Sequence, residues 1–299
     1  MKVLIFGCGF SGLEIGRRLA SQGIAVTGTT RSQDKFSLLR QAGIEPLLFD
    51  GHSCDQTLTS KLAETSHLVI SIAPPRQENA EEPKSSVDPV LAALGGLVAP
   101  DRLPKLTWVG YLSTVGVYGN HDGAWIDETA DLSPSSARSR QRVRAEKEWA
   151  DATESRSLPL AILRLSGIYG PGRNALKSAK QGRSRRLVKS GQVFNRIHVG
   201  DIAQAVDLAS SKSVAGIFNI TDDQPAPPQD VVTFAHQLLG TSPPPELDFE
   251  SADLSPMARS FYGDNKRVSN LRSKNLLGMQ YQWPDYAVSL QRMFDENDW

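Results

Sequence analysis

Three glycines near the start of the chain have the spacing of a phosphate-binding turn. Residues 7–12 read Gly-Cys-Gly-Phe-Ser-Gly. In this spacing the first glycine turns the chain, the second lets a pyrophosphate lie against the backbone, and the third lets a helix pack closely. The N–H groups that begin the helix would then bind the phosphates. We therefore predict a dinucleotide site that includes Gly7, Gly9, Phe10, Ser11 and Gly12.

The residues on either side supply the elements that such a turn needs. Residues 3–6 are an apolar run typical of a strand, and the apolar residues from Leu13 to Leu19 recur at helical spacing. A strand before the turn and a helix after it favour nucleotide binding over a tight turn with no ligand.

The end of the second predicted strand, residues 24–29, indicates which dinucleotide binds. An acidic side chain at this place would bond the ribose 2′-OH of NAD, whereas a guanidinium would pair with the 2′-phosphate of NADP. The chain has Thr30, Arg31 and Ser32 there, and the first carboxylate after this strand is Asp34. We predict that Thr30, Arg31 and Ser32 bind NADP, with NAD as the alternative cofactor. The competing interpretation of Arg31 is a solvated loop residue.

Strand and helix patterns alternate along the chain, which predicts an α/β fold with a doubly wound parallel sheet. Further strands are expected at 46–49, 67–72 and 106–112, and helices at 34–42, 58–64 and 90–99; residues 75–89 read as an exposed loop. Such sheets bind ligands beyond the carboxyl ends of their strands. By this position Asp50, Ser71, Ala73 and Pro74 join the predicted cofactor site.

Composition narrows the class of protein. A chain of 299 residues suits one α/β domain with a small second lobe, and its zero net charge gives no indication of a nucleic-acid or membrane partner. No apolar stretch approaches the roughly 18 residues of a membrane span, and no signal segment is evident, so we expect a cytoplasmic protein. Cys8 and Cys54 make no metal or disulfide pattern.

Three later segments carry a family resemblance. Residues 113–119 read Ser-Thr-Val-Gly-Val-Tyr-Gly, residues 159–172 end in Tyr-Gly-Pro-Gly, and residues 195–203 contain Val-Gly-Asp-Ile-Ala. They resemble, in order, the S-[ST]-x-x-V-Y-G stretch, the sixth strand with its loop, and the R-x-x-x-V-x-D-x-A segment of extended short-chain dehydrogenase/reductases, the family of nucleotide-sugar epimerases and dehydratases.

The resemblance runs from residue 1 to about residue 240. It implies an NAD(P)-binding Rossmann domain at 1–170 and a smaller substrate-binding lobe at 171–299, interleaved with the last strands and helices of the core. It also implies cofactor contacts from Ser113, Gly167 and Ile168. The glycine turn is one residue shorter than the family's usual G-x-x-G-x-x-G, so the chain resembles an atypical subgroup.

The family's catalytic group, Y-x-x-x-K with a Glu four residues later, is not intact. In the segment 138–147, aligning Glu146 with that Glu puts Arg142 in the Lys place and Arg138 in the Tyr place. Aligning Lys147 with the family's Lys instead puts Val143 in the Tyr place. Both alignments lose the Tyr.

The resemblance then supplies Thr114 as the catalytic hydroxyl. An arginine cannot exchange a proton near neutral pH, but it can hold an anion or polarise a carbonyl oxygen. We therefore take Thr114, Arg138 and Arg142 as candidate catalytic residues, with a solvated helix face as the alternative for the arginines. The predicted function is an NAD(P)-dependent oxidoreductase or epimerase-like enzyme; the alternative is a non-catalytic NADP(H) sensor.

Basic residues follow the loop after Gly172, where the family binds the anionic part of its substrates: Lys177, Lys180, Arg183, Arg185, Arg186 and Lys189. They suggest a small, anionic substrate. Their irregular spacing, without aromatic residues, argues against a nucleic-acid surface. For His198 we prefer a structural role over a catalytic one.

Overall fold

The computed structural model describes residues 1–75, 88–95 and 102–299. Most of the predicted loop at 75–89 and the end of the predicted helix at 90–99 lie outside the described residues.

Seven parallel strands form the central sheet, in the order β11-β7-β5-β4-β1-β2-β3. Their bounds are β1 Lys2–Phe6, β2 Ala25–Thr30, β3 Ile44–Leu48, β4 His67–Ile70, β5 Trp108–Thr114, β7 Leu160–Leu165 and β11 Gly216–Ile220. The chain reverses its direction of winding between β1 and β4, and a crevice at such a point is where doubly wound sheets bind ligands. The predicted Rossmann-type fold is confirmed.

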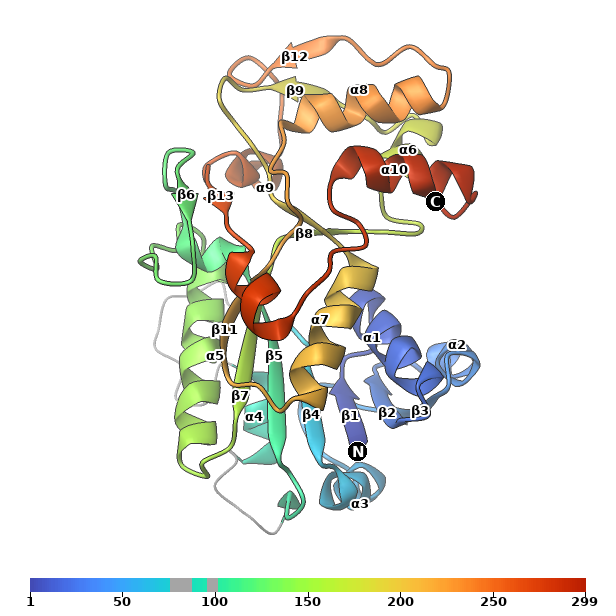
Figure 1. Cartoon of the computed structure of the whole chain (residues 1–299), viewed down its shortest axis with the longest axis vertical. Helices are drawn as coiled ribbons and strands as arrows, with labels where there is room; N and C mark the ends of the chain where they lie inside the picture. Colours follow the sequence, from blue (N-terminus) through green and yellow to red (C-terminus); the bar gives the residue numbers. More distant parts are fainter. Residues whose placement is uncertain (76–87, 96–101) are drawn as a thin grey trace.

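Helices cover both faces of the sheet (Figure 1). On one face lie α1 (Phe10–Ser21), α2 (Phe36–Gln41) and α7 (Val199–Ser211), whose buried Ile15, Leu39 and Ile202 share one apolar core. On the other lie α3 (Gln56–Glu64), α4 (Pro89–Leu94) and α5 (Ala137–Glu154), whose Leu58, Val90 and Trp149 share the second core. Both faces of the sheet are therefore buried, as parallel sheets require.

Some predicted bounds differ from those observed. The helix expected at 34–42 is a 3-10 turn, η1 (Gln33–Lys35), followed by α2. The fifth strand extends to Thr114, so the Ser-Thr pair of the family motif lies within β5. Helix α4 ends at Leu94 because Gly95 takes a left-handed conformation, with φ +70°.

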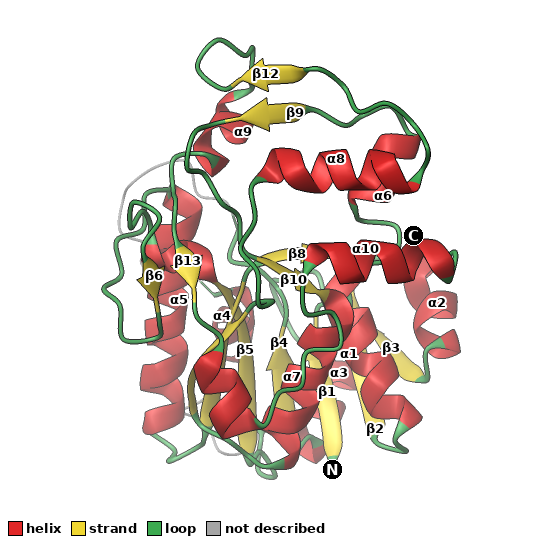
Figure 2. Cartoon of the chain, turned by 45° about the horizontal axis from the view of Figure 1, so that its top comes forward, coloured by secondary structure: helices red, strands yellow, loops and turns green. Residues whose placement is uncertain are grey.

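A smaller lobe lies beyond the carboxyl ends of the strands (Figures 1 and 2). It contains α6 (Ala175–Lys180), β9 (Arg186–Val188), α8 (Pro228–Leu238), β12 (Glu246–Asp248), α9 (Pro256–Phe261) and α10 (Tyr286–Asp295), with β9 paired to β12. Strand β11 and helix α7 follow residue 171 in sequence but belong to the central sheet and its helix layer.

Short elements join the two parts. Strand β8 (Gly167–Tyr169) pairs with β10 (Arg196–His198), and β6 (Trp125–Ile126) pairs with β13 (Arg267–Val268). A 3-10 helix, η3 (Val115–Tyr118), continues from β5, and a π-helix, η4 (Ser273–Leu277), precedes the last segment.

Candidate cofactor and active site

The glycine turn has the geometry that its sequence predicts. Gly7 has φ +93°, and its N–H donates to Thr29 Oγ1 at 2.9 Å. A Cβ at Gly7 would lie 2.7 Å from Ile72 Cγ1, and a Cβ at Gly12 would overlap the Gly7 carbonyl oxygen. Neither position admits a side chain without a shift of the turn.

Gly9 faces open space. A Cβ built there would meet no heavy atom of the described chain within 4 Å. Helix α1 begins at the next residue, Phe10; within the described residues no side chain caps its N-terminus, and its first turn contains no acid. Unsatisfied N–H groups beside an open backbone fit a bound diphosphate.

The end of β2 carries the residues predicted to choose between NAD and NADP. Thr30 is buried and Arg31 is exposed. The Ser32 hydroxyl accepts from the Asp34 N–H at 3.3 Å and donates to the Asp34 carboxylate at 2.9 Å. The tip of β2 therefore presents one exposed guanidinium, on Arg31, and a carboxylate three residues later, on Asp34.

The other residues predicted from strand position follow strands β3 and β4 of the same sheet. Asp50 is exposed and follows β3, and the His52 N–H that it accepts at 2.8 Å lowers the pKa of its carboxyl. The Ser71 N–H donates to Phe6 O at 2.9 Å, which extends the β1–β4 pairing to the edge of the glycine turn. Ala73 and Pro74 continue from there.

Helix α5 is fixed to the sheet by a buried ion pair. Arg164 on β7 donates to Glu146 through Nη2 at 2.7 Å and Nε at 3.2 Å, and the Ser113 hydroxyl donates to the same carboxylate. Ser113, predicted to touch the cofactor, thus points toward α5.

The two candidate catalytic arginines have different surroundings. Arg138 is exposed in the first turn of α5. Arg142 is 8% exposed, and its Nη1 donates to Leu112 O at 2.8 Å and to Tyr111 Oη at 3.1 Å. Arg142 therefore holds α5 against β5.

A second hydroxyl, missed by the sequence analysis, lies beside Thr114. Thr114 Oγ1 accepts from the Gly116 N–H at 3.1 Å. A Cβ at Gly116 would lie 3.4 Å from Thr114 Oγ1 and 3.1 Å from Ser139 Oγ, so both hydroxyls lie next to Gly116. Ser136 caps α5 through the Ser139 N–H and donates to Ser139 Oγ at 2.9 Å. The Ser-x-x-Ser spacing at a helix start was the available signal.

The loop after β7 reaches the same region from the lobe side. The Gly167 N–H donates to Asn195 O at 3.0 Å, and Ile168 is half-buried within the β8–β10 pair. His198 ends β10 and caps the N-terminus of α7, because its Nδ1 accepts from the Gly200 N–H at 3.1 Å. Its ring stacks on Trp283, with ring centres 3.8 Å apart. Burial, with a smaller contribution from Arg292, lowers the His198 pKa to about 3.

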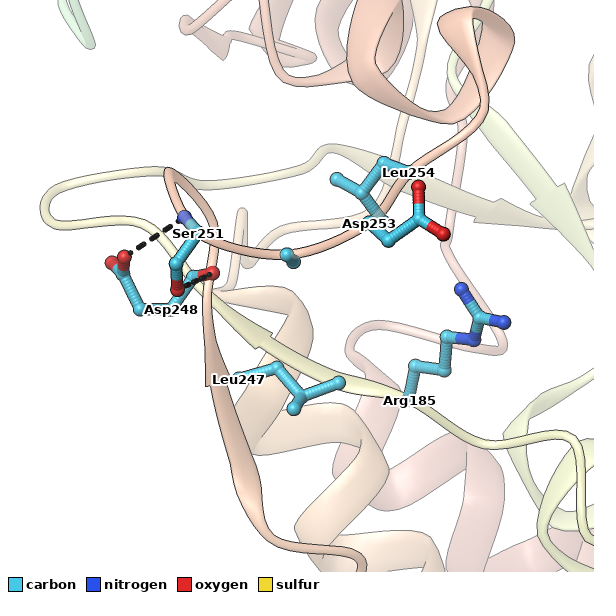
Figure 3. A pocket seen from close by; sticks show the side chains of 7 residues that line it. Arg185, Leu247, Asp248, Ser251, Asp253 and Leu254 are labelled. Carbon is cyan, nitrogen blue, oxygen red and sulfur yellow. Dashed lines mark hydrogen bonds between the residues drawn. The ribbon is translucent and has the colours of Figure 1, made fainter.

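Several basic residues after Gly172 already have partners within the lobe. Arg186 lies 3.2 Å from Glu246, Lys180 lies over the Trp299 ring, and Lys189 donates to Tyr262 O. Arg185 instead lines an open pocket of about 470 Å³ on the lobe, into which Asp253 also points (Figure 3). This pocket lies at the β9–β12 edge of the lobe, away from the glycine turn.

The described residues contain neither a metal-binding cluster nor a membrane-spanning helix. No group of three or more His, Cys, Asp or Glu in this part of the chain could hold a metal ion. Nor does any helix in the described ranges have the length and apolar character needed to cross a membrane.

The chain belongs to the NAD dependent epimerase/dehydratase family, whose sequence model matches residues 3–221. Protein YeeZ of Escherichia coli K12 is 29% identical over 303 residues, which cover 96% of this chain and 98% of that protein. A solved structure of a functionally unknown conserved protein from Silicibacter pomeroyi DSS is 45% identical, with a TM-score of 0.87 and coverage of 99% and 98%.

The fold is also that of a UDP-glucuronic acid 4-epimerase from Bacillus cereus, solved in complex with NAD. The TM-score is 0.76 at 17% identity, and 99% of this chain and 98% of that chain are covered. Family membership makes a nicotinamide dinucleotide the expected cofactor, and the open backbone at Gly9 with the uncapped start of α1 fits its diphosphate.

Proposed function

We propose that the protein is an NAD(P)-dependent oxidoreductase or epimerase-like enzyme that acts on a small, anionic substrate. The observation that carries this proposal is the pair of hydroxyls, Thr114 and Ser139, that lie together next to Gly116. They lie where β5 ends, and the glycine turn lies at the same edge of the same sheet.

The cofactor would be held by the glycine turn, with Phe10 and Ser11 in the first turn of α1. Arg31, exposed at the end of β2, would pair with the 2′-phosphate, which favours NADP over NAD. The remaining contacts would come from the carboxyl edge of the sheet and the loop after β7: Thr30, Ser32, Asp50, Ser71, Ala73, Pro74, Ser113, Gly167 and Ile168. A bound nicotinamide supplies hydride exchange at its 4-position.

Thr114 would hydrogen-bond the reacting oxygen. Because its Oγ1 accepts from the Gly116 N–H, its hydroxyl hydrogen can point to a substrate oxygen. The Ser139 hydroxyl has the same freedom, since Ser136 donates to its oxygen. Protons could therefore pass between solvent and the reacting oxygen through Ser136 and Ser139, in place of the missing tyrosine.

The arginines of α5 would act around this centre. Arg138, exposed at the start of the helix, would hold an anionic part of the substrate. Arg142 would position the helix through its bonds to β5 rather than by touching substrate.

Turnover is the decisive test. Purified protein with NADP⁺ or NADPH is assayed against carbonyl compounds, alcohols and nucleotide sugars, and Thr114→Val is compared with Thr59→Val, a matched change on the exposed face of α3. We expect Thr114→Val alone to reduce turnover about tenfold to thousandfold without loss of NADP affinity. Tight NADP binding without turnover of any of these classes would contradict an enzyme and favour an NADP(H) sensor.

A further inference from the structure

An arginine that belongs neither to the glycine turn nor to the three quoted family segments lies at the rim of the candidate cofactor site. The guanidinium carbon of Arg173 lies 5.6 Å from the centre of the Phe10 ring. Phe10 is the first residue of α1 and follows the open Gly9 directly. The positive charge of Arg173 is therefore held next to the place where a diphosphate would lie.

The backbone of Arg173 is fixed by a closed turn. Gly170 and Arg173 exchange two backbone hydrogen bonds, each of 3.0 Å, and Gly172 between them has φ +74°. The Asn174 side chain donates to Gly170 O at 2.9 Å and caps α6 by accepting from the Lys177 N–H. A turn tied in this way presents the guanidinium from the lobe at little entropic cost on binding.

The same corner holds further donors. His198 is 4% exposed, and its Nε2 has no hydrogen-bond partner among the residues that the structure describes. Because Nδ1 accepts from the Gly200 N–H, Nε2 carries the hydrogen. A Cβ at Gly170 would lie 3.3 Å from both His198 Nε2 and Phe10 Cζ, so this donor lies near the edge of the ring that Arg173 covers. The uncapped N–H groups of α1 complete a corner rich in donors.

We propose that Arg173 binds the diphosphate of the dinucleotide from the lobe side, opposite the glycine turn. The guanidinium fork matches phosphate oxygens bidentately, and stacking on Phe10 aligns its plane. This inference rests on the proposed cofactor binding. Since NAD⁺ and NADP⁺ share the diphosphate, Arg173 strengthens the binding of both equally and does not choose between them.

Calorimetric titration of the full chain with NAD⁺, NADP⁺ and ADP-ribose tests this role. We expect Arg173→Gln to weaken all three by the same factor, about tenfold to hundredfold, as for a lost charge-assisted hydrogen bond. Arg173→Lys keeps the positive charge but not the forked guanidinium, so its affinities should fall between those of the wild type and Arg173→Gln. Phe10→Leu removes the stacking ring and should weaken all three less than Arg173→Gln does.

Arg259→Gln is the matched control, because Arg259 is an exposed arginine of the same lobe whose guanidinium carbon lies 5.0 Å from the centre of the Phe249 ring. It should leave the three affinities unchanged. If Arg173→Gln binds all three ligands like the wild type while Gly9→Val does not bind, Arg173 has no such role and the proposed function stands. A loss confined to NADP⁺ would also overturn the inference, in favour of a 2′-phosphate contact. If the wild type binds none of the three, the proposed function fails, and the inference fails with it.

Discussion

The carboxylate of Glu146 on α5 accepts two hydrogen bonds from the guanidinium of Arg164 on β7, in a pair whose side chains are only 7% and 3% exposed. Ser113 on β5 donates to the same carboxylate. Three elements therefore meet at one buried charge pair, and the first turn of α5 is placed over the end of β5 as a consequence.

Replacing one partner of this ion pair should lower the free energy of unfolding more than replacing both partners. Arg164→Met leaves a buried carboxylate without its cation and should lower the free energy of unfolding by about 3–5 kcal/mol. The double change Glu146→Leu with Arg164→Met should cost less than that single change. Urea unfolding measures both, with Lys147→Met as control, since the exposed Lys147–Asp151 pair is worth about 1 kcal/mol or less. A double variant less stable than Arg164→Met would refute this account.

Valine at Gly9 should impair dinucleotide binding, whereas valine at Gly12 should impair stability. At Gly9 the added side chain enters open space, so the fold should persist while dinucleotide affinity falls by orders of magnitude. At Gly12 it would collide with the Gly7 carbonyl, so the melting temperature itself should fall. Thermal unfolding and calorimetry separate the two effects. Unchanged dinucleotide affinity in Gly9→Val would show that the diphosphate lies elsewhere.

Arg31→Gln should affect one cofactor selectively. Removing the guanidinium should weaken NADP⁺ by about 1.5–3 kcal/mol and leave NAD⁺ nearly unchanged, because NAD⁺ has no 2′-phosphate. Titration with both dinucleotides measures the difference. Equal losses would mean that Arg31 acts on the structure of the β2 tip.

Activity should vary little with pH near neutrality. The hydroxyls of Thr114 and Ser139 and the arginines of α5 do not titrate there, and the His198 pKa is lowered to about 3 by burial, so this ring stays neutral. We expect kcat to be nearly flat from about pH 6 to 9, and Ser139→Ala to lower kcat about a hundredfold if it carries the proton. A steep rise that persists in His198→Gln would reveal a base other than these residues.

Stability, in contrast, should depend on pH through Asp222. Both of its carboxylate oxygens are buried without a hydrogen-bond partner in the described part of the chain. Burial raises its pKa to about 8; Arg196 opposes this shift, while Asp223 and Asp285 add to it. A carboxyl with a raised folded-state pKa stabilises the fold below its unfolded pKa, near 3.9, and this stabilisation is lost as pH rises toward 8.

Asp222→Asn removes that titration while keeping the shape of the side chain. The variant's free energy of unfolding, minus that of the wild type, should therefore rise from about pH 5 to 8. Above pH 8 this difference should stay constant. Urea unfolding at several pH values follows this difference. Parallel curves for the two proteins would show that Asp222 does not change its pKa on folding.

The glycine turn and the order of strands and helices could be predicted because they depend on neighbours in sequence. Glycine at positions 7 and 12 is required by contacts within the turn and with the adjoining strand β4, and apolar periodicity marks the strands and helices. The family motifs added the strand-end position of Thr114. The assignment of β11 and α7 to the core followed from the family's interleaved order rather than from any local pattern.

The face of α5 that points toward the sheet could not be predicted in the same way. Its first turns are polar on every side, so hydrophobic periodicity gives no indication of which residues face the sheet. The sequence pointed to Arg138 and Arg142, and the structure places Ser139 beside Thr114, Arg142 against β5 and Arg138 in solvent. The phase of the helix is set by the ion pair between Glu146 and Arg164, which joins residues on different elements.

The sequence by itself determined the class of fold and the shape of the glycine turn, because both depend on residue types at short, fixed spacing. Only the tertiary structure decided which side chains meet at the ends of the strands. Ser139 lies near Thr114 next to Gly116, and Arg173 lies over the Phe10 ring, across 25 and 163 positions of the chain respectively. Such contacts arise from the packing of α5 and of the lobe against the sheet, and local spacing carries no information about them.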